Sequence, residues 1–220
     1  MSTPFDPLSI CCPTARRSRR KEARPGELLS AALDLFVEKG YAATRVEEVA
    51  ARAGVSKGTL FLYFPSKEAL FQAVVRDNIA GRFAEWNAEL DDFPGTSAEL
   101  VHHAMRQWWE RIGQTQAAGI TKIMMSEGPL FPELAAFYQN EVIAPGHALL
   151  RRILQRGLDR GEFHLPNLDW AVYSLIAPMI FLVMWRYSMA ACCPSERAID
   201  PLPFIETQVN LLLMGMQVRR

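Results

Sequence analysis

The chain has 220 residues, half of them hydrophobic, and its 24 basic side chains balance 24 acidic ones. Such a chain can bury the core of one or two globular domains. The first residues lack the charged-then-apolar order of a signal peptide, which argues against secretion. The longest uncharged apolar run, residues 170–185, is shorter than the roughly 20 residues of a membrane span and contains Pro178, so no membrane association is expected.

Charge is unevenly distributed along the chain. Residues 1–67 carry eleven Lys and Arg against seven acids, a net charge of +4, and the remainder has a net charge of −4. A basic N-terminal third predicts contact with a polyanion. We expect residues 1–23 to form a flexible basic arm. Its cluster at 16–21 is either a solvated tail or an additional contact to DNA phosphates or the minor groove.

The four cysteines form two adjacent pairs, Cys11/Cys12 and Cys192/Cys193. Neither pair has the spacing of zinc ligands, so no metal or cofactor is expected. The pairs are interpreted as reduced thiols of a cytoplasmic protein, with redox sensing left as the alternative.

Four helices are predicted in the first third of the chain. An apolar stripe from Leu28 to Phe36 marks the first, with Pro25 in its first turn and Gly40 at its end. A capping box at 44–47 predicts that the second helix begins at Arg45, and Gly54 ends it. Ser56 can cap a third helix that Pro65 closes, and Ser66 a fourth that continues to Leu90.

The rest of the chain also has helical periodicity and no useful strand alternation. Helices are expected from a capping box at 96–99 to residue 112, over 120–126, over 132–158 with a break at Pro145-Gly146, from Asn167 or Asp169, and over 201–217. The predicted fold class is therefore all-α with about nine helices. A three-helix domain would cover residues 24–75, and a second helical domain residues 76–220; their roles follow from the motif and the resemblance below.

The segment Val46–Lys67 has the pattern of a helix-turn-helix. Apolar residues at 46, 49, 50, 53, 55, 60 and 64 face inward, and Gly54 permits the turn. The remaining side chains of the third helix are Lys57, Thr59, Phe61 and Tyr63, which suit the short, lightly charged helix end that enters a major groove. The alternative for Phe61 and Tyr63 is a place in the core.

Residues 28–75 closely resemble the DNA-binding domain of tetracycline-repressor-type (TetR/AcrR) regulators, through Gly40-Tyr41, Thr44 and the run from Ala50 to Leu70. The resemblance implies that a recognition helix presents Ser56, Lys57, Gly58, Thr59 and Phe61 to DNA. It implies that Tyr63 contacts backbone or sugar, and that Thr44, Arg45 and Lys67 contact phosphate. Base contacts would select sequence, and phosphate contacts would position the protein.

A single head of this kind reads few base pairs, so a two-fold dimer with heads about 34–36 Å apart is expected. The last two predicted helices are the candidates for its interface, because they are too apolar to remain wet. The expected contacts are Ala171, Leu175, Pro178, Met179, Leu182, Val183, Arg186, Ile205, Val209, Leu212, Leu213 and Met216, with Ser174, Ala177 and Gly215 allowing close packing.

An effector pocket is predicted among the central helices, because methionines and aromatic residues suit an adaptable apolar cavity. Its candidates are Trp86, Met105, Trp108, Trp109, Ile123, Met124, Phe131, Phe137, Tyr138, Phe181 and Trp185. The alternative for each is ordinary core. The effector would be a hydrophobic or aromatic small molecule.

Together these features predict a dimeric repressor that a small effector releases from a palindromic double-stranded DNA operator. An activator with the same head is the first alternative. A helical enzyme is a second: His102, His103, His147 and His164 lack the spacing of a metal site, and no phosphate-binding loop or nucleophile elbow is present. The third is an interaction or membrane-associated protein built on residues 170–185.

Overall fold

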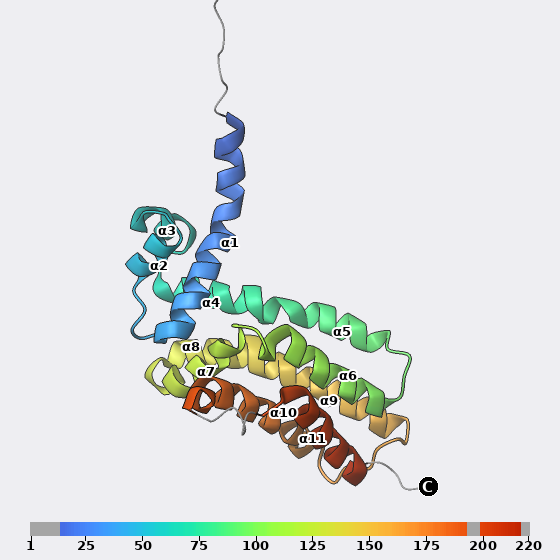
Figure 1. Cartoon of the computed structure of the whole chain (residues 1–220). Helices are drawn as coiled ribbons and strands as arrows, with labels where there is room; N and C mark the ends of the chain where they lie inside the picture. The colour runs from blue at the N-terminus through green and yellow to red at the C-terminus, as the bar shows by residue number, and fades with distance from the viewer. Residues whose placement is uncertain (1–13, 193–198, 217–220) are drawn as a thin grey trace, which may run out of the picture.

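The computed structural model describes residues 14–192 and 199–216, and every regular element within these ranges is helical (Figure 1). The predicted all-α class is confirmed. The α-helices are α1 Thr14–Lys39, α2 Val46–Arg52, α3 Lys57–Tyr63, α4 Lys67–Asn78, α5 Phe83–Asp91, α6 Ser97–Trp108, α7 Ala118–Glu127, α8 Pro132–Tyr138, α9 Ala144–Asp159, α10 Leu168–Met184 and α11 Pro201–Met216.

Two helix starts in the N-terminal third differ from expectation. Helix α1 begins at Thr14, so Pro25 lies inside it and residues 14–23 of the expected arm are helical; residues 1–13, with Cys11 and Cys12, lie outside the described residues. Helix α2 begins one residue late, because the capping pair is Arg45 and Glu48: the Arg45 N–H donates to Glu48 Oε2 at 3.4 Å. The side chain of Thr44 is therefore free for another role.

Two long predicted helices are interrupted. The fourth ends at Asn78, and after Ile79 (φ −130°, ψ −65°) a 3₁₀ turn over Ala80–Arg82 leads into α5. The helical stretch from Pro132 contains a π turn over Gln139–Ile143 directly before Pro145, which cannot donate to the preceding turn. Similar π turns follow α6 (Trp109–Gly113) and α10 (Trp185–Met189).

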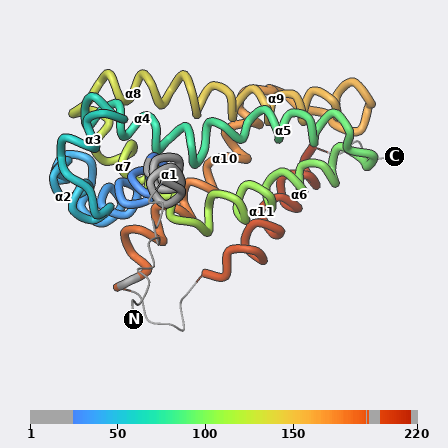
Figure 2. Tube along the Cα trace, turned by 90° about the horizontal axis from the view of Figure 1, so that it is seen from above, coloured from blue at the N-terminus to red at the C-terminus, as the bar shows by residue number. Residues whose placement is uncertain are grey.

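Figures 1 and 2 show how the helices are arranged. The C-terminal half of α1 lies beside α2, α3 and α4, and together they form the head. The body lies below, where α4 continuing into α5 runs beside α8 continuing into α9. Helix α10 packs on α9, α7 and α11, and α11 also packs on α6.

The buried side chains form two clusters rather than one. Core cluster one joins the head to part of the body, since Phe36 and Phe71 share it with Ile120 and Leu134 of α7 and α8. Core cluster two lies between α6, α9, α10 and α11. The packing thus attaches the head to α7 and α8, and α7 in turn packs on α10.

Candidate DNA-binding surface and effector cavity

Helices α2 and α3 form the predicted helix-turn-helix. Gly54 adopts φ +68° in the turn, a conformation that suits glycine, and the Val55 N–H donates to the Ala50 carbonyl at 2.9 Å. Ser56 caps α3 by accepting from the Thr59 N–H at 3.1 Å, and Leu60 is fully buried beneath the helix. These contacts hold α3 with its outer face toward solvent.

The outer face of α3 contains the expected side chains and one that the sequence reasoning missed. Lys57 is exposed and forms a 2.6 Å ion pair with Glu47 of α2, and its hydrogen bond lowers the pKa of Glu47. Thr59 is half-buried, and Phe61 is 38% exposed. Leu62 is 84% exposed. Its spacing of three residues from Thr59 was a signal that could have placed it on this face.

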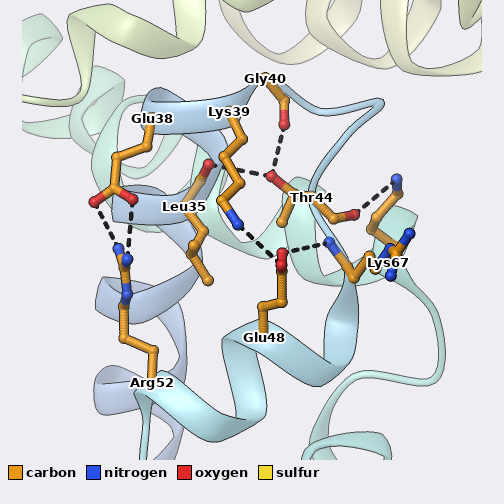
Figure 3. A network of polar contacts seen from close by, with 9 residues as sticks. Leu35, Glu38, Lys39, Gly40, Thr44, Glu48, Arg52 and Lys67 are labelled. Atoms are coloured by element: carbon orange, nitrogen blue, oxygen red, sulfur yellow. Dashed lines mark hydrogen bonds and ion pairs between the residues drawn. The ribbon is translucent and has the colours of Figure 1, made fainter.

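Two of the residues expected near phosphate have other partners (Figure 3). Thr44 is only 2% exposed, and its hydroxyl donates to the Gly40 carbonyl at 2.6 Å and to the Leu35 carbonyl at 3.1 Å. Thr44 therefore secures the end of α1 through its hydroxyl, and its expected phosphate contact stays a prediction. Arg45 beside it is exposed. Tyr63 is half-buried against core cluster one.

Lys67 is the second of these residues, and its expected phosphate contact also stays a prediction. Its Nζ donates to the carbonyls of Tyr41 at 2.8 Å, Ala42 at 3.2 Å and Thr44 at 3.2 Å, and it lies 4.4 Å from the centre of the Tyr41 ring. Three acceptors use all the donors of an ammonium group. Burial lowers the pKa of Lys67, and the nearby carboxylate of Glu127 opposes that shift. Lys67 thus holds the loop between α1 and α2 instead of reaching outward.

Glu127, the last residue of α7, fastens the body to the same loop. Its carboxylate accepts from the Tyr41 N–H at 3.2 Å and from the Ala42 N–H at 2.7 Å. Gly40 has φ +85°, and a Cβ there would lie 2.2 Å from Glu127 Oε1, so glycine is required for this approach. We call this set of contacts the Glu127 junction.

A second polar contact joins α4 to the π turn over Gln139–Ile143, which we call the π turn of the body. Arg76 Nε donates to Glu141 Oε2 at 2.7 Å, and its second nitrogen binds the other carboxylate oxygen. The guanidinium also lies 4.9 Å from the centre of the Phe137 ring. Arg76 lowers the pKa of Glu141, as expected for a bidentate pair. The head is thereby attached to α7 and α8 by polar contacts as well as by its core.

A cavity of about 580 Å³ lies between the two core clusters. Its size falls within the range of small-molecule sites. Cluster one contributes Trp86, Ile112 and Tyr138 to the lining, and cluster two contributes Met105 and Met179. Other lining residues, among them Phe83, Glu89, His103, Gln107, Trp108, Thr121, Met124, Gln139, His147 and Tyr173, come from α5, α6, α7, α9, α10 and the π turn of the body.

The structure places five of the eleven candidate pocket residues around this cavity: Trp86, Met105, Trp108, Met124 and Tyr138. The other six lie elsewhere. Trp109 and Ile123 are buried core, Phe131 packs edge-on against Tyr41, Phe137 lies beneath Arg76, and Phe181 and Trp185 pack near each other on the outer side of α10. The spacing of these residues in the sequence predicted that they are apolar and buried, but it did not predict which side of each helix faces the cavity.

The polar groups of the lining are few and mostly satisfied. The hydroxyls of Thr121 and Tyr138 are hydrogen bonded at 3.0 Å, and burial raises the pKa of Tyr138 to about 12. Burial lowers the pKa of His147, whose ring lies 4.9 Å from that of Tyr173. Sequence reasoning treated His147 as an ordinary histidine, because no neighbour along the chain indicated the cavity.

The outward apolar surface of α10 and α11 differs in register from the expected dimer contacts. Leu175, Met179, Leu182, Val183, Ile205, Val209, Leu213 and Met216 are buried within the protomer. The exposed large side chains on these helices are instead Trp170, Tyr173, Phe181, Leu202, Leu211 and Met214, with Ser174, Ala177 and Gly215 also exposed. The segment Leu168–Met189 is apolar and long enough to cross a membrane, and 28% of its most apolar 18-residue stretch is buried in the protomer.

Within the described residues there is no cluster of three or more His, Cys, Asp or Glu side chains that could hold a metal ion. Cys192 is an exposed free thiol, and Cys193 lies outside the described residues.

Comparison with known proteins decides the family. Residues 28–74 match the model of bacterial regulatory proteins of the tetR family, and residues 99–201 match the C-terminal domain of AefR-like transcriptional repressors. The chain belongs to the tetR family. The suspected resemblance is confirmed, and so is the architecture of a helix-turn-helix head followed by a helical regulatory domain. The family consists of transcriptional regulators.

The head of this tetR-family protein is better matched than its body. RutR of Escherichia coli is 46% identical over 85 residues, which are 39% of this chain and 40% of RutR, so the match spans about two fifths of that relative. EthR of Mycolicibacterium smegmatis is 25% identical over 91% of this chain and 90% of its own. A regulator from Saccharomonospora viridis, solved in complex with choline, has a TM-score of 0.74 at 19% identity and covers 90% of this chain and 100% of its own.

Proposed function

We propose that the protein is a cytoplasmic homodimeric repressor that leaves its operator when a small molecule occupies the cavity. One observation carries this proposal: the cavity lies between the cluster that holds the recognition helix and the cluster beneath the exposed face of α10 and α11. A molecule that binds in the cavity would change the position of the recognition helix relative to the face formed by α10 and α11. The match of residues 99–201 to the C-terminal domain of a transcriptional repressor supports repression rather than activation.

Recognition of DNA would use the outer face of α3. Lys57, Thr59, Phe61 and Leu62 supply a cation, a hydroxyl and apolar groups on a short helix, with Arg45 exposed nearby. Lys57 would exchange its ion pair with Glu47 for a base edge or phosphate, because an exposed pair contributes little to stability. Ser56 and Gly58 are also exposed at the start of this helix.

A second copy of the chain would cover the outward face of α10 and α11. This face exposes 67% of Trp170, 66% of Leu211 and 71% of Met214, which is unusual for large apolar side chains on adjacent helices. Helix α10 is apolar on every side, and such a helix is normally buried on every side. An isologous two-fold contact would bury it and place two recognition helices on one operator.

The effector would act by changing the separation of the two heads. Each head is fixed to α7 and α8 by core cluster one, by the Glu127 junction and by Arg76–Glu141. Met124 lines the cavity one helical turn before Glu127. A molecule that displaces Met124 and the cavity wall would therefore shift the head relative to the dimer face. A coupling of about 1–3 kcal/mol would change operator affinity by roughly 5–150-fold.

The direct test starts by enriching operator fragments from random DNA with the purified protein. We expect a palindrome whose half-sites are about one helical turn apart. A cavity-filling variant, Ala104→Phe, would retain operator binding and lose release by effector, whereas Ala88→Phe on the exposed side of α5 would behave as the parent. Absence of any enriched sequence would refute the proposal.

The dimer is tested separately by Leu211→Arg, with Asn210→Arg as the control on the neighbouring exposed position. Sedimentation should show a dimer for the parent and the control and a monomer for Leu211→Arg. If all three sediment alike, the second copy does not bind this face. Repression of a reporter that carries the enriched operator, relieved by effector, would distinguish a repressor from an activator.

A further inference from the structure

We infer that the effector is an uncharged, largely apolar molecule that carries a hydrogen-bond acceptor. The inference rests on the proposed function, because it concerns the same cavity and gives the chemical class of its ligand. It follows from the charges that line the cavity and from one buried donor that lacks a partner.

The lining residues include no Lys, Arg or Asp. Apart from the histidines His103 and His147, an anionic ligand would therefore find no basic side chain in the lining to pair with its charge. The cost of removing such a charge from water is several kcal/mol or more. His147 does not supply the missing positive charge, because burial lowers its pKa and favours the neutral imidazole.

The single carboxylate in the lining is already paired. Glu89 accepts from Arg111 Nη2 at 2.8 Å, and Glu85 Oε1 lies 3.6 Å from Nη1 of the same guanidinium. The two carboxylates repel an anion that approaches from the cavity, although Arg111 Nη1 is itself buried without a hydrogen-bond acceptor, since Glu85 lies beyond hydrogen-bond distance. A cationic ligand would have to take Glu89 away from Arg111 and leave that guanidinium with fewer acceptors.

The acceptor is inferred from Trp86. Trp86 lines the cavity, and its indole Nε1 is buried without a hydrogen-bond partner among the described residues. The atom is closed to a water-sized probe in this conformation, so a ligand would reach it by turning the indole ring toward the cavity. Indole N–H is a donor only, so a partner must be an oxygen or nitrogen acceptor. A buried donor without a partner costs about 1–3 kcal/mol, and a ligand that supplies the acceptor recovers that cost. The nearby hydroxyls of Thr121 and Tyr138, by contrast, already satisfy one another.

The experiment compares four molecules with one alkyl chain and different heads: 1-decanol, decanoate, decyltrimethylammonium and decane. Calorimetry on the intact protein, at a pH well above the carboxylate pKa, gives their affinities. We expect decanol to bind at least about tenfold more tightly than decanoate or the ammonium, since each places an unpaired charge in the cavity. We also expect decanol to bind more tightly than decane.

Two variants locate the contacts. Trp86→Phe keeps the ring and removes the N–H, so the advantage of decanol over decane should shrink severalfold while decane binds as before. Ala104→Phe should weaken all probes, and Ala88→Phe should weaken none.

The outcomes separate the inference from the proposed function. Tighter binding of decanoate or decyltrimethylammonium, or an unchanged decanol advantage in Trp86→Phe, would overturn the inference and leave an effector cavity in place. Failure of all four probes to bind, or binding that Ala104→Phe does not affect, would count against the effector cavity itself and thus against both.

Discussion

Removal of the Glu127 carboxylate is the sharpest test of how the head is attached. In Glu127→Ala, the Tyr41 and Ala42 N–H groups lose their acceptors, which lie at 3.2 and 2.7 Å in the parent. A hydrogen bond to a charged group contributes about 1.5–3 kcal/mol. The Ala42 contact is exposed and belongs at the lower end of that range, so we expect a loss of about 2–4 kcal/mol in the free energy of unfolding.

Urea unfolding followed by circular dichroism measures this loss. The matched control is Asp77→Ala, which removes an exposed acid from α4 that forms no ion pair with the described residues. Surface changes of that kind normally stay within about 0.5 kcal/mol. Equal urea midpoints for the two variants would refute the structural role of the Glu127 junction.

The same variant tests transmission between cavity and head. If the junction keeps the head rigidly attached to α7, its loss leaves the recognition helix free to retain operator spacing when the effector binds. The ratio of operator affinities without and with effector should then fall severalfold in Glu127→Ala and stay at the parental value in Asp77→Ala. A parental ratio in both variants would show that core cluster one alone transmits the signal.

Three further predictions follow from single contacts. Gly40→Ala should cost about 1–2 kcal/mol or more, because φ is +85° and the new Cβ meets Glu127, whereas Gly26→Ala in α1 meets no atom within 4 Å and should stabilise by about 0.5–1 kcal/mol in the same thermal or urea assay. Burial raises the pKa of Tyr138 from 10.0 to about 12, so its stabilising effect is complete below pH 10 and lost as the pH rises toward 12. That loss is about 3 kcal/mol, and urea titrations across the range should show it in the parent but not in Tyr138→Phe. Leu62→Ala should leave the unfolding free energy within about 0.5 kcal/mol of the parent and weaken operator binding, most at sites with a thymine methyl group in the half-site; unchanged binding would exclude Leu62 from the interface.

The features that the sequence predicted well are those with a local physical cause. Ser56, Ser66, Thr96 and Asn167 each accept a backbone N–H at the start of the helix they were expected to cap. The turn at Gly54 follows equally from its neighbours. Such features depend on a few adjacent residues, so a single sequence contains them.

The features that it predicted poorly depend on partners distant in the chain. Thr44 had the spacing of a cap, but the carbonyls of Leu35 and Gly40 bind its hydroxyl. Lys67 resembled a phosphate ligand, but the loop between α1 and α2 uses its three donors. The acceptors of Lys67 are far from it in the chain, whereas Gly40 is close to Thr44, where a cap and a contact to this carbonyl compete for one hydroxyl.

The outward face of α10 illustrates a different limit. Periodicity identifies a buried face by contrast with a polar one, and α10 offers no such contrast, because nearly all of its residues are apolar. Leu175, expected at the dimer contact, and Phe181, expected in the effector pocket, are both large and apolar, yet the first is buried in the protomer and the second is 46% exposed. Only the packing of α9 and α11 against one side decides between them.

The two core clusters do not correspond to two consecutive stretches of the sequence. An expected boundary near residue 75 would separate head from body, but core cluster one extends from Leu28 to Val142 and core cluster two from Leu90 to Met216. Residues between 90 and 142 contribute side chains to both core clusters. Under the proposed function, a ligand in the cavity would act between the unit containing α3 and the unit containing α11, which meet at Trp108 and Leu149. Such a regulator would need no flexible hinge between its domains, because the effector would change the distance between the recognition helix and the proposed dimer face.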